Sequence, residues 1–464
     1  MGQRFVACDR EQSFLMPPDV REWLPAGHLA WFVIDAVEQM DLATFYAAYR
    51  RDGRSRPAYD PAMMVAVLVY AYAREMRSSR LIERACEEDV AFRVLAAQQR
   101  PDHATIARFV ERHQDAIAGL FGEVLELCAK SGLVRVGVIA VDGTKVAANA
   151  SRDANCDYGQ LAREILEEAK ATDAAEDEFY GEARGDELPA QRPRRPRVAA
   201  RGQAPPRRRA RPSGAGGPPR SPHACARGQA PPRRGAADRG ARQRRLRALP
   251  RDRADEKRPP AGRAFAAQAY TPPDTPQGHI NLTDPDSRVV KGLRGFIQGY
   301  NAQAVSNEHQ VVLAAEIMTA GGDFGHLEPM VEAAQREVRT AGIDETPEVL
   351  LADAGYWHQE QMHNVVDRGI QVLTRPDASK RKTARPGWTG GLYAFMRRVL
   401  ATETGSQLYR RRQPMIEPIF GQIKHNRGID RFSRRGRAAV RAEWRLICAT
   451  HNLLKLHRHA LTAA

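Results

Sequence analysis

The stretch Val136-Gly-Val-Ile-Ala-Val-Asp142-Gly143 decides the fold, because it places a carboxylate directly after an uninterrupted apolar run. Such a run suits a strand that is covered on both faces of its sheet, and Gly143 predicts a turn that ends the strand. An ionised aspartate in that position needs a cation, a metal ion or solvent, because an unpaired charge is costly to bury. We therefore expect Asp142 to belong to a site.

The pattern recurs once, at Val349-Leu-Leu-Ala-Asp353-Ala-Gly355, and predicts that two strands bring two carboxylates to one end of one sheet. A third acid, Glu417, lies in a basic helical segment. Two strand-end aspartates and a helix glutamate suit a two-metal phosphoryl-transfer site with two Mg²⁺ ions, or Mn²⁺, ~4 Å apart. Asp142 would bridge both ions, Asp353 would bind one, and Glu417 the other. Taken singly, each aspartate is more often a turn or cap residue; only the combination favours the site.

Glu417 stands in the segment Tyr409-Arg-Arg-Arg-Gln-Pro-Met-Ile-Glu417-Pro-Ile-Phe-Gly-Gln-Ile-Lys424. Pro418 suits the first turn of a helix, and Lys424, seven residues after Glu417, would lie two turns along the same face. This spacing predicts an acid that holds metal beside a base that holds the DNA backbone. The alternative is an ordinary solvated helix face. The residues expected to bind DNA are Lys424, Arg412, Arg427, Arg431, Arg434 and Arg435.

The net charge of +15 is concentrated in one segment of the 464-residue chain. Residues 191–258 hold 22 Lys and Arg against 4 Asp and Glu, so the remainder carries a net charge of −3. Global charge is therefore no argument for a DNA-binding core. The six cysteines are scattered without metal-ligand spacing, and no apolar run is long enough for a signal core or a membrane span. We expect a cytoplasmic, nucleoid-associated protein that contacts no membrane.

Residues 14–130 read as helical throughout, with a first helix that opens after Asp60-Pro61 and a second that begins at Ser78 or Ser79. A third, long helix is expected to begin after Asp102 and to end at Gly132. Arginines near the helix ends are compatible with a helix-turn-helix-like reader of DNA, and equally with a helical bundle that carries solvated arginines. Both interpretations remain open from spacing alone.

Residues 192–258 contain 11 prolines, 21 arginines and one lysine, and the nine-residue stretch that begins at Ala200 repeats at Ala226. A segment with almost no large apolar residues cannot build a core, so we expect disorder. Three interpretations remain open: a basic arm that binds nucleic acid, a solvated linker, and GC-rich DNA translated out of frame.

Residues 294–305 and 311–318 predict a hairpin, and a helix then precedes the strand that ends at Asp353. A second helix from His358 to Arg368 and a strand over 370–374 complete a mixed sheet with helices on its faces. This is an α/β, RNase H-like plan. The predicted domains are a helical N-terminal domain over 1–132, a catalytic domain over 133–151 and 281–464, and an insertion over 152–280.

Several long motifs resemble a known family, the bacterial insertion-sequence transposases of the DDE type with an InsH-like N-terminal domain. RPAYDPAMMVAVLVYAYAREMRSSRLIERACEEDVAFRVL and RPDHATIARF resemble the N-terminal domain. VDGTKVAANAS, NLTDPDSRVVKGLRGFIQGYNAQAV, LLADAGYW and EPIFGQIKHNRG resemble the catalytic domain. The resemblance implies Asp142, Asp353 and Glu417 as the catalytic and metal-binding triad, Mg²⁺ as cofactor, double-stranded DNA as partner, and a homodimer or larger synaptic complex. It implies cleavage and strand transfer at terminal inverted repeats. The alternatives are an inactive remnant that still binds DNA and a non-mobile RNase H-like nuclease.

Overall fold

The computed structural model describes residues 20–49, 58–180, 279–292, 295–377 and 388–463. The expected disorder of residues 191–258 therefore lies outside the described residues. Residues up to Ala171 and from Gln277 onward belong to one compact unit. The second unit, Thr172–Pro276, is described only over residues 172–180, at the end of helix α8 (Tyr158–Tyr180). None of the described helices is long and apolar enough to cross a membrane.

The described residues between 20 and 130 form helices and no strand. Asp60 caps α3 by accepting the N–H of Ala62, with Pro61 in the first turn, as the sequence predicts. The expected long third helix is wrong: it is divided at His113, whose ring is buried against Phe45 and Phe109. The elements are η1 Val20–Trp23, α1 Leu29–Glu38, α2 Ala43–Ala47, α3 Pro61–Ala73, α4 Ser79–Glu88, α5 Val90–Leu95, α6 His103–Arg112 and α7 Gln114–Lys130.

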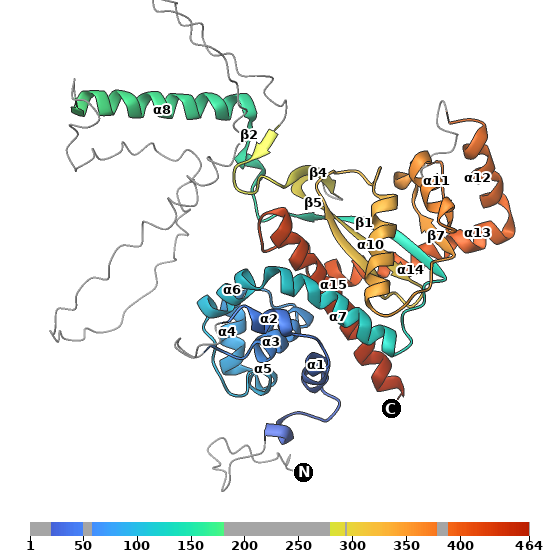
Figure 1. The fold of residues 1–464 in the computed structure, drawn as a ribbon, viewed down its shortest axis with the longest axis horizontal. Coiled ribbons are helices and arrows are strands. Elements are labelled where there is room, and N and C mark those ends of the chain that lie inside the picture. The colour runs from blue at the N-terminus through green and yellow to red at the C-terminus, as the bar shows by residue number, and fades with distance from the viewer. Residues whose placement is uncertain (1–19, 50–57, 181–278, 293–294, 378–387, 464) are drawn as a thin grey trace, which may run out of the picture. The chain divides into compact units, whose positions relative to one another are not determined.

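A mixed sheet forms the centre of the remaining fold (Figure 1). Strand β1 (Val138–Ala147) pairs antiparallel with β5 (Gly295–Asn307) and parallel with β7 (Val349–Ala352), which in turn pairs parallel with β8 (Gln371–Thr374). Strands β4 (Arg288–Gly292) and β6 (Val312–Met318) both pair antiparallel with β5. The expected hairpin and the strand-helix-strand unit after it are confirmed.

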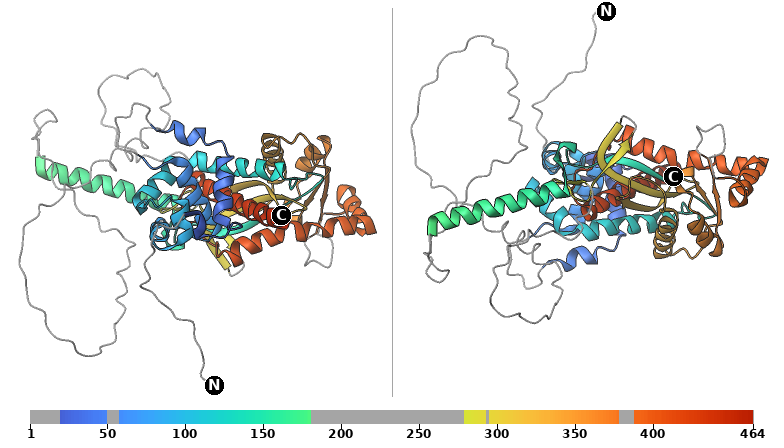
Figure 2. Two further views of the ribbon diagram at one scale, coloured as in Figure 1. Left: turned by 90° about the horizontal axis from the view of Figure 1, so that it is seen from below. Right: turned by 90° about the horizontal axis from the view of Figure 1, so that it is seen from above.

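Helices cover both faces of this sheet. Both views in Figure 2 show the strands between α10 (Leu327–Thr340) with α11 (Gln359–Asp367) on one side and α14 (Arg412–Gly421) on the other. The apolar stripe of α10 is buried and consists of Leu327, Met330, Val331, Ala334 and Val338. The remaining elements are η3 Ala354–Tyr356, α12 Gly391–Ala401, α13 Glu403–Arg410, the π-helical turn Gln422–Asn426 and α15 Arg437–Ala463.

Helix α15 joins the N-terminal helices to the sheet. It lies beside α7 (Figure 1) and along strand β6. The side chain of Asn452 donates to the carbonyl of Val312 and accepts its N–H, each at 2.8 Å, so it satisfies the backbone at the start of β6. One continuous hydrophobic core runs from the N-terminal helices into the sheet.

A two-stranded ribbon joins two segments that are distant in the sequence. Strand β2 (Asn155–Asp157) pairs antiparallel with β3 (His279–Asn281), and the side chain of Asn281 donates to the carbonyl of Ser151 and to Asn155. The segment that ends at Asp157 and the segment that begins at His279 therefore lie side by side.

Candidate active site

Asp142 lies within strand β1 and not at its end. The predicted turn at Gly143 is wrong, because β1 pairs with β5 without a break from Ile139 to Ala147. The parallel pairing with β7 stops at Ala140, so Asp142 is the second residue beyond the last pair of these two strands. Strand β1 therefore holds the carboxylate in place through its pairing with β5. The edge of β1 that β7 no longer covers is open to other groups.

Burial is the main influence on Asp142, whose side chain is 17% exposed. The pKa of this carboxyl is raised from 3.8 to about 6, chiefly by burial and also by the neighbouring carboxylate of Asp353. The guanidinium of Arg412 and the N–H of Gly143 oppose the shift. Such a carboxyl favours a cation beside it, since the charged form is otherwise poorly solvated.

Asp353 follows strand β7 directly, as the sequence predicts. It caps the short helix η3 by accepting the N–H of Gly355 at 2.8 Å, and its carbonyl accepts the hydroxyl of Thr374 at 2.8 Å. Burial raises the pKa of this carboxyl, the Gly355 N–H lowers it, and the carboxylate of Asp323 raises it. The expectation of two aspartates at adjacent strands of one sheet is met by the geometry.

Glu417 lies on α14, in the helix interior and not in its first turn. Pro418 is likewise interior, so the predicted helix start at Pro418 is wrong. A proline there cannot donate to the carbonyl four residues earlier, that of Pro414. The side chain of Gln310 donates to that carbonyl at 2.7 Å instead, and Ser306 donates to the next one, at Met415. These two bonds hold α14 against β5 and the turn that follows it.

Arg412 pairs with two of the three acids and lies in the field of the third. Its guanidinium lies 2.9 Å from Asp142 Oδ2 and 3.5 Å from Glu417 Oε1, and Asp353 contributes to its raised pKa. Asp353, Arg412 and Glu417 line one pocket, together with Tyr409. The guanidinium, 15% exposed, is therefore engaged with carboxylates in this structure, whereas the sequence suggested that it binds DNA.

The carboxylates of this pocket are suitable ligands for a hard divalent cation, but in this structure Arg412 pairs with Glu417 there. Among the described residues, no three acidic, histidine or cysteine side chains lie close enough together to bind a metal ion. Asp142 and Glu417 share one guanidinium, and Glu417 is 46% exposed and so has room to change rotamer. Carboxylate oxygens are what Mg²⁺ and Mn²⁺ prefer. The ligand chemistry of these carboxylates therefore fits such an ion.

One acid near the site was missed by sequence analysis. Asp323 lies in the loop after β6, and its Oδ1 accepts hydrogen bonds from Lys145, Asn301 and Gln303. No strand end or helix cap marks Asp323 in the sequence, which is why the pattern used for Asp353 does not detect it. The alternation along β1 gives one usable signal: Lys145 would point to the face opposite Asp142, where it needs an anion.

The residues expected to bind DNA lie in three different environments. Lys424 donates to the hydroxyl of Thr144 and to the carbonyl of Lys145, each at 2.7 Å, so only its third N–H is left for a phosphate. The expectation for Arg427 is wrong. The residue is 4% exposed, and its guanidinium donates to the carbonyls of Tyr72 and Ile447 and to the hydroxyl of Thr450. It is a core residue.

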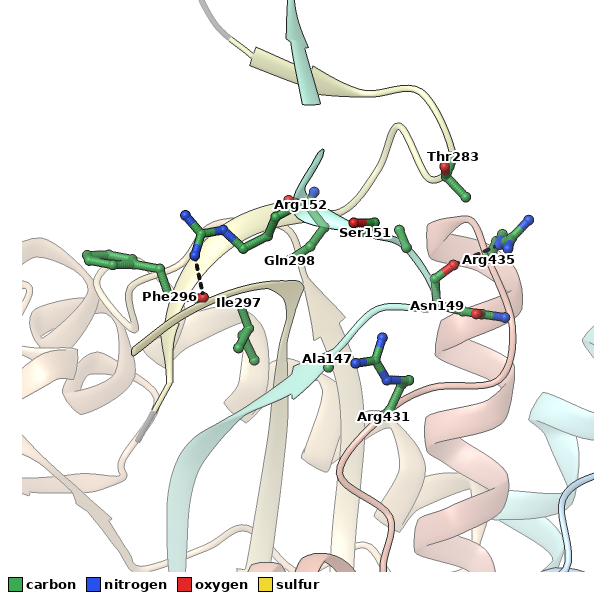
Figure 3. Close-up of a pocket in the computed structure, with 11 residues that line it drawn as sticks. Ala147, Asn149, Ser151, Arg152, Thr283, Phe296, Ile297, Gln298, Arg431 and Arg435 are labelled. Atoms are coloured by element: carbon green, nitrogen blue, oxygen red, sulfur yellow. Dashed lines mark hydrogen bonds between the residues drawn. The ribbon is translucent and has the colours of Figure 1, made fainter. Parts of the chain in front are cut away.

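Arg431 and Arg435 line an open groove beside the end of β1 (Figure 3). Arg431 donates to the carbonyl of Ala148 at 3.0 Å and Arg435 to that of Asn149 at 2.8 Å, which leaves further N–H groups of both side chains available. Arg152 lines the same groove, and its described lining contains no acid. Arg434 lines a neighbouring groove and donates to Val110.

Comparisons with known proteins match two parts of the chain. A family model described as a transposase domain (DUF772) matches residues 18–112, and one described as a transposase DDE domain matches residues 374–457. The second match contains Glu417 and all six predicted DNA-binding residues, whereas Asp142 and Asp353 lie outside both. No curated protein and no solved structure matches the chain.

Proposed function

Because the chain belongs to the DDE transposases of insertion sequences, we propose that it cleaves and joins DNA at the terminal inverted repeats of its own element. Asp142, Asp353 and Glu417 are the proposed catalytic residues. The observation that carries this proposal is that Arg412 pairs with Asp142 and Glu417 and lines one pocket with Glu417 and Asp353, beside a sheet of order β4-β5-β1-β7-β8 in which β6 also pairs with β5. That order, with β5 antiparallel to β1, supports an RNase H-like catalytic domain.

The roles of the chain's own residues follow from their surroundings. Two Mg²⁺ or Mn²⁺ ions, when bound, would activate the attacking oxygen and stabilise the leaving one. Asp142 and Asp353 would hold them from rigid positions on β1 and after β7, and Glu417 would complete the set by a rotamer change. Arg412 neutralises Asp142 until then, and its guanidinium would afterwards be free to bind a phosphate oxygen.

The groove in Figure 3 is the proposed contact for double-stranded DNA outside the reacting bond. Arg152, Arg431 and Arg435 are already positioned by bonds to backbone carbonyls, so they lose little conformational freedom when they bind phosphates. The groove begins at Ala147, five residues along β1 from Asp142. At about 3.3 Å per residue this is roughly 16 Å, or about five base pairs of duplex.

The wider organisation follows the family and is also part of the proposal. Residues 1–132 would bind DNA, residues 133–151 with 281–464 would carry the chemistry, and residues 152–280 would be an insertion. Two or more copies would assemble on a pair of element ends, in the cytoplasm and on the nucleoid. A remnant that binds DNA without catalysis is the competing function.

The test is a cleavage and strand-transfer assay of the purified full chain on DNA that carries its own element ends. The variants are Asp142→Asn, Asp353→Asn and Glu417→Gln, and the matched control is Glu403→Gln, in the first turn of the neighbouring helix α13. Each of the three variants is expected to lose metal-dependent cleavage and to keep DNA binding. Binding without cleavage by the unmodified chain would favour the remnant, and cleavage by any one variant would remove that residue from the site.

A further inference from the structure

The carboxylate of Asp323 is anchored in an asymmetric way. Its Oδ1 accepts three hydrogen bonds, from Lys145 Nζ at 3.1 Å, Asn301 Nδ2 at 2.9 Å and Gln303 Nε2 at 2.9 Å. Within the described part of the chain, Oδ2 has no hydrogen-bond partner. A simple ion pair with Lys145 would not require two further donors on the same oxygen, so the loop is held for more than charge neutralisation.

Two glycines provide the space for this carboxylate. A Cβ at Gly143 would lie 2.8 Å from Asp323 Oδ1, and a Cβ at Gly355 would lie 3.3 Å from Asp323 Oδ2 and 3.0 Å from Asp353 Oδ1. Neither glycine has a positive φ, so close approach and not backbone conformation explains the missing side chain. Asp323 and Asp353 therefore both lie against Gly355.

The amide of Gln303 links Asp323 to the turn that carries Asp353. Its Nε2 donates to Asp323, so its Oε1 is left to accept the hydroxyl of buried Tyr356. Tyr356 is the last residue of η3, the helix that Asp353 caps. Without the acceptor at Asp323, nothing in this pair of bonds would fix which way the Gln303 amide points.

We propose that Asp323 is a positioning residue for Asp353: it orients the amide of Gln303, which holds Tyr356 and thereby the turn that presents the Asp353 carboxylate. The inference rests on the proposed function only in taking Asp353 as a metal ligand. Residues that orient a metal ligand by hydrogen bonds typically change metal affinity by 10- to 100-fold when they are removed. Asp323 makes no direct contact with the ion in this account.

The experiment measures Mn²⁺ binding to the full chain without DNA, by electron paramagnetic resonance of free Mn²⁺. Asp323→Ala is expected to weaken binding about tenfold. Asp323→Asn keeps an acceptor oxygen for Gln303 and is expected to remain within about threefold of the unmodified chain. The matched control is Glu316→Ala. It removes a similarly buried carboxylate, which pairs with Arg441 and lies in β6, the strand before the loop of Asp323. The control should bind Mn²⁺ normally.

Tyr356→Phe tests the same link without removing a charge. If both residues act through Gln303, Tyr356→Phe should weaken Mn²⁺ binding, and the double variant with Asp323→Ala should be no weaker than Asp323→Ala alone. Additive losses, an Asn variant as weak as the Ala variant, or an Asp323→Ala variant that binds like the Glu316→Ala control would each overturn the inference. Unchanged binding by Asp353→Asn would instead overturn the proposed role of Asp353 itself.

Discussion

Replacement of Asp142 by Asn should change how the stability of the protein depends on pH. Burial raises the pKa of Asp142 from 3.8 to about 6 in the folded chain. Below pH 3.8 the carboxyl is protonated in both the folded and the unfolded chain, and the contribution of Asp142 to the free energy of unfolding is then largest. As the pH rises toward 6 the unfolded chain releases this proton first, so stability is lost, and above pH 6 the loss is complete.

The size of the effect follows from the shift. Two pKa units correspond to about 3 kcal/mol, since each unit is worth 1.36 kcal/mol. The free energy of unfolding of the unmodified chain should therefore fall by about 3 kcal/mol more than that of Asp142→Asn between pH 3.5 and pH 7.5. The comparison uses this pH-dependent difference, because the Asn variant also loses the ion pair with Arg412, which changes its absolute stability.

The assay is urea unfolding followed by tryptophan fluorescence, with EDTA present, at several pH values for both proteins. In a second series with excess Mg²⁺ at pH 7.5, the unmodified chain should regain stability while Asp142→Asn gains less, since an ion that binds only the folded state adds about 2.7 kcal/mol at 100 times its Kd. Parallel pH profiles for the two proteins would refute the reasoning, because they would mean that Asp142 titrates normally.

Three further predictions concern residues outside the acidic pocket. Burial lowers the pKa of His451 from 6.5 to about 3, so the contribution of this residue to stability is present above pH 6.5 and is lost as the pH falls toward 3. Between pH 7.5 and 4.5, the free energy of unfolding of His451→Gln should therefore fall by about 2.7 kcal/mol less than that of the unmodified chain. Urea unfolding would measure this difference. Arg427→Met should lower the free energy of unfolding by about 2 to 4 kcal/mol, because it leaves buried carbonyls unpaired, and should not change the salt dependence of DNA binding. Arg435→Gln should weaken DNA binding without changing stability. DNA titrations at several salt concentrations should show a salt slope reduced by about one unit, and the free energy of unfolding should stay within about 0.5 kcal/mol of that of the unmodified chain. A stable Arg427→Met variant with a reduced salt slope would contradict the assignment of Arg427 to the core. An Arg435→Gln variant that binds DNA normally would contradict the assignment of Arg435 to the DNA-binding groove.

Local patterns predicted the parts of the fold that depend on local contacts. The apolar runs before Asp142 and Asp353 are buried strands, and the hairpin of β5 with β6 follows the predicted boundaries within a few residues. In these segments propensity and burial favour the same structure, so a single sequence is informative.

The errors have partners that are distant in the sequence. Gly143 does not end β1, because pairing with β5 outweighs the turn preference of one glycine. Pro418 does not begin a helix, because Gln310 satisfies the carbonyl that a proline leaves open. Arg427 is buried, because Tyr72 and Ile447 offer it carbonyls from two other helices. The groups that determine the structure at these three residues lie outside any short stretch of sequence around them.

The placement of the two aspartates was predicted more fully than the groups around them. Two aspartates at adjacent strands could be inferred because the ends of parallel strands meet at one edge of a sheet. The contact of Arg412 with Asp142 joins residues 270 positions apart, and that of Asp323 with Lys145 joins residues 178 positions apart. Such contacts depend on the register of β1 with β5, which only the three-dimensional structure provides.

The most direct test of the central claim is anomalous diffraction from crystals of the full chain grown or soaked with Mn²⁺. The account predicts anomalous peaks in contact with the carboxylates of Asp142 and Asp353, with Glu417 turned toward them and Arg412 withdrawn from Asp142. No peak at these carboxylates at saturating Mn²⁺, with Arg412 still bound to Asp142, would contradict the claim that the three acids form a metal-dependent catalytic centre.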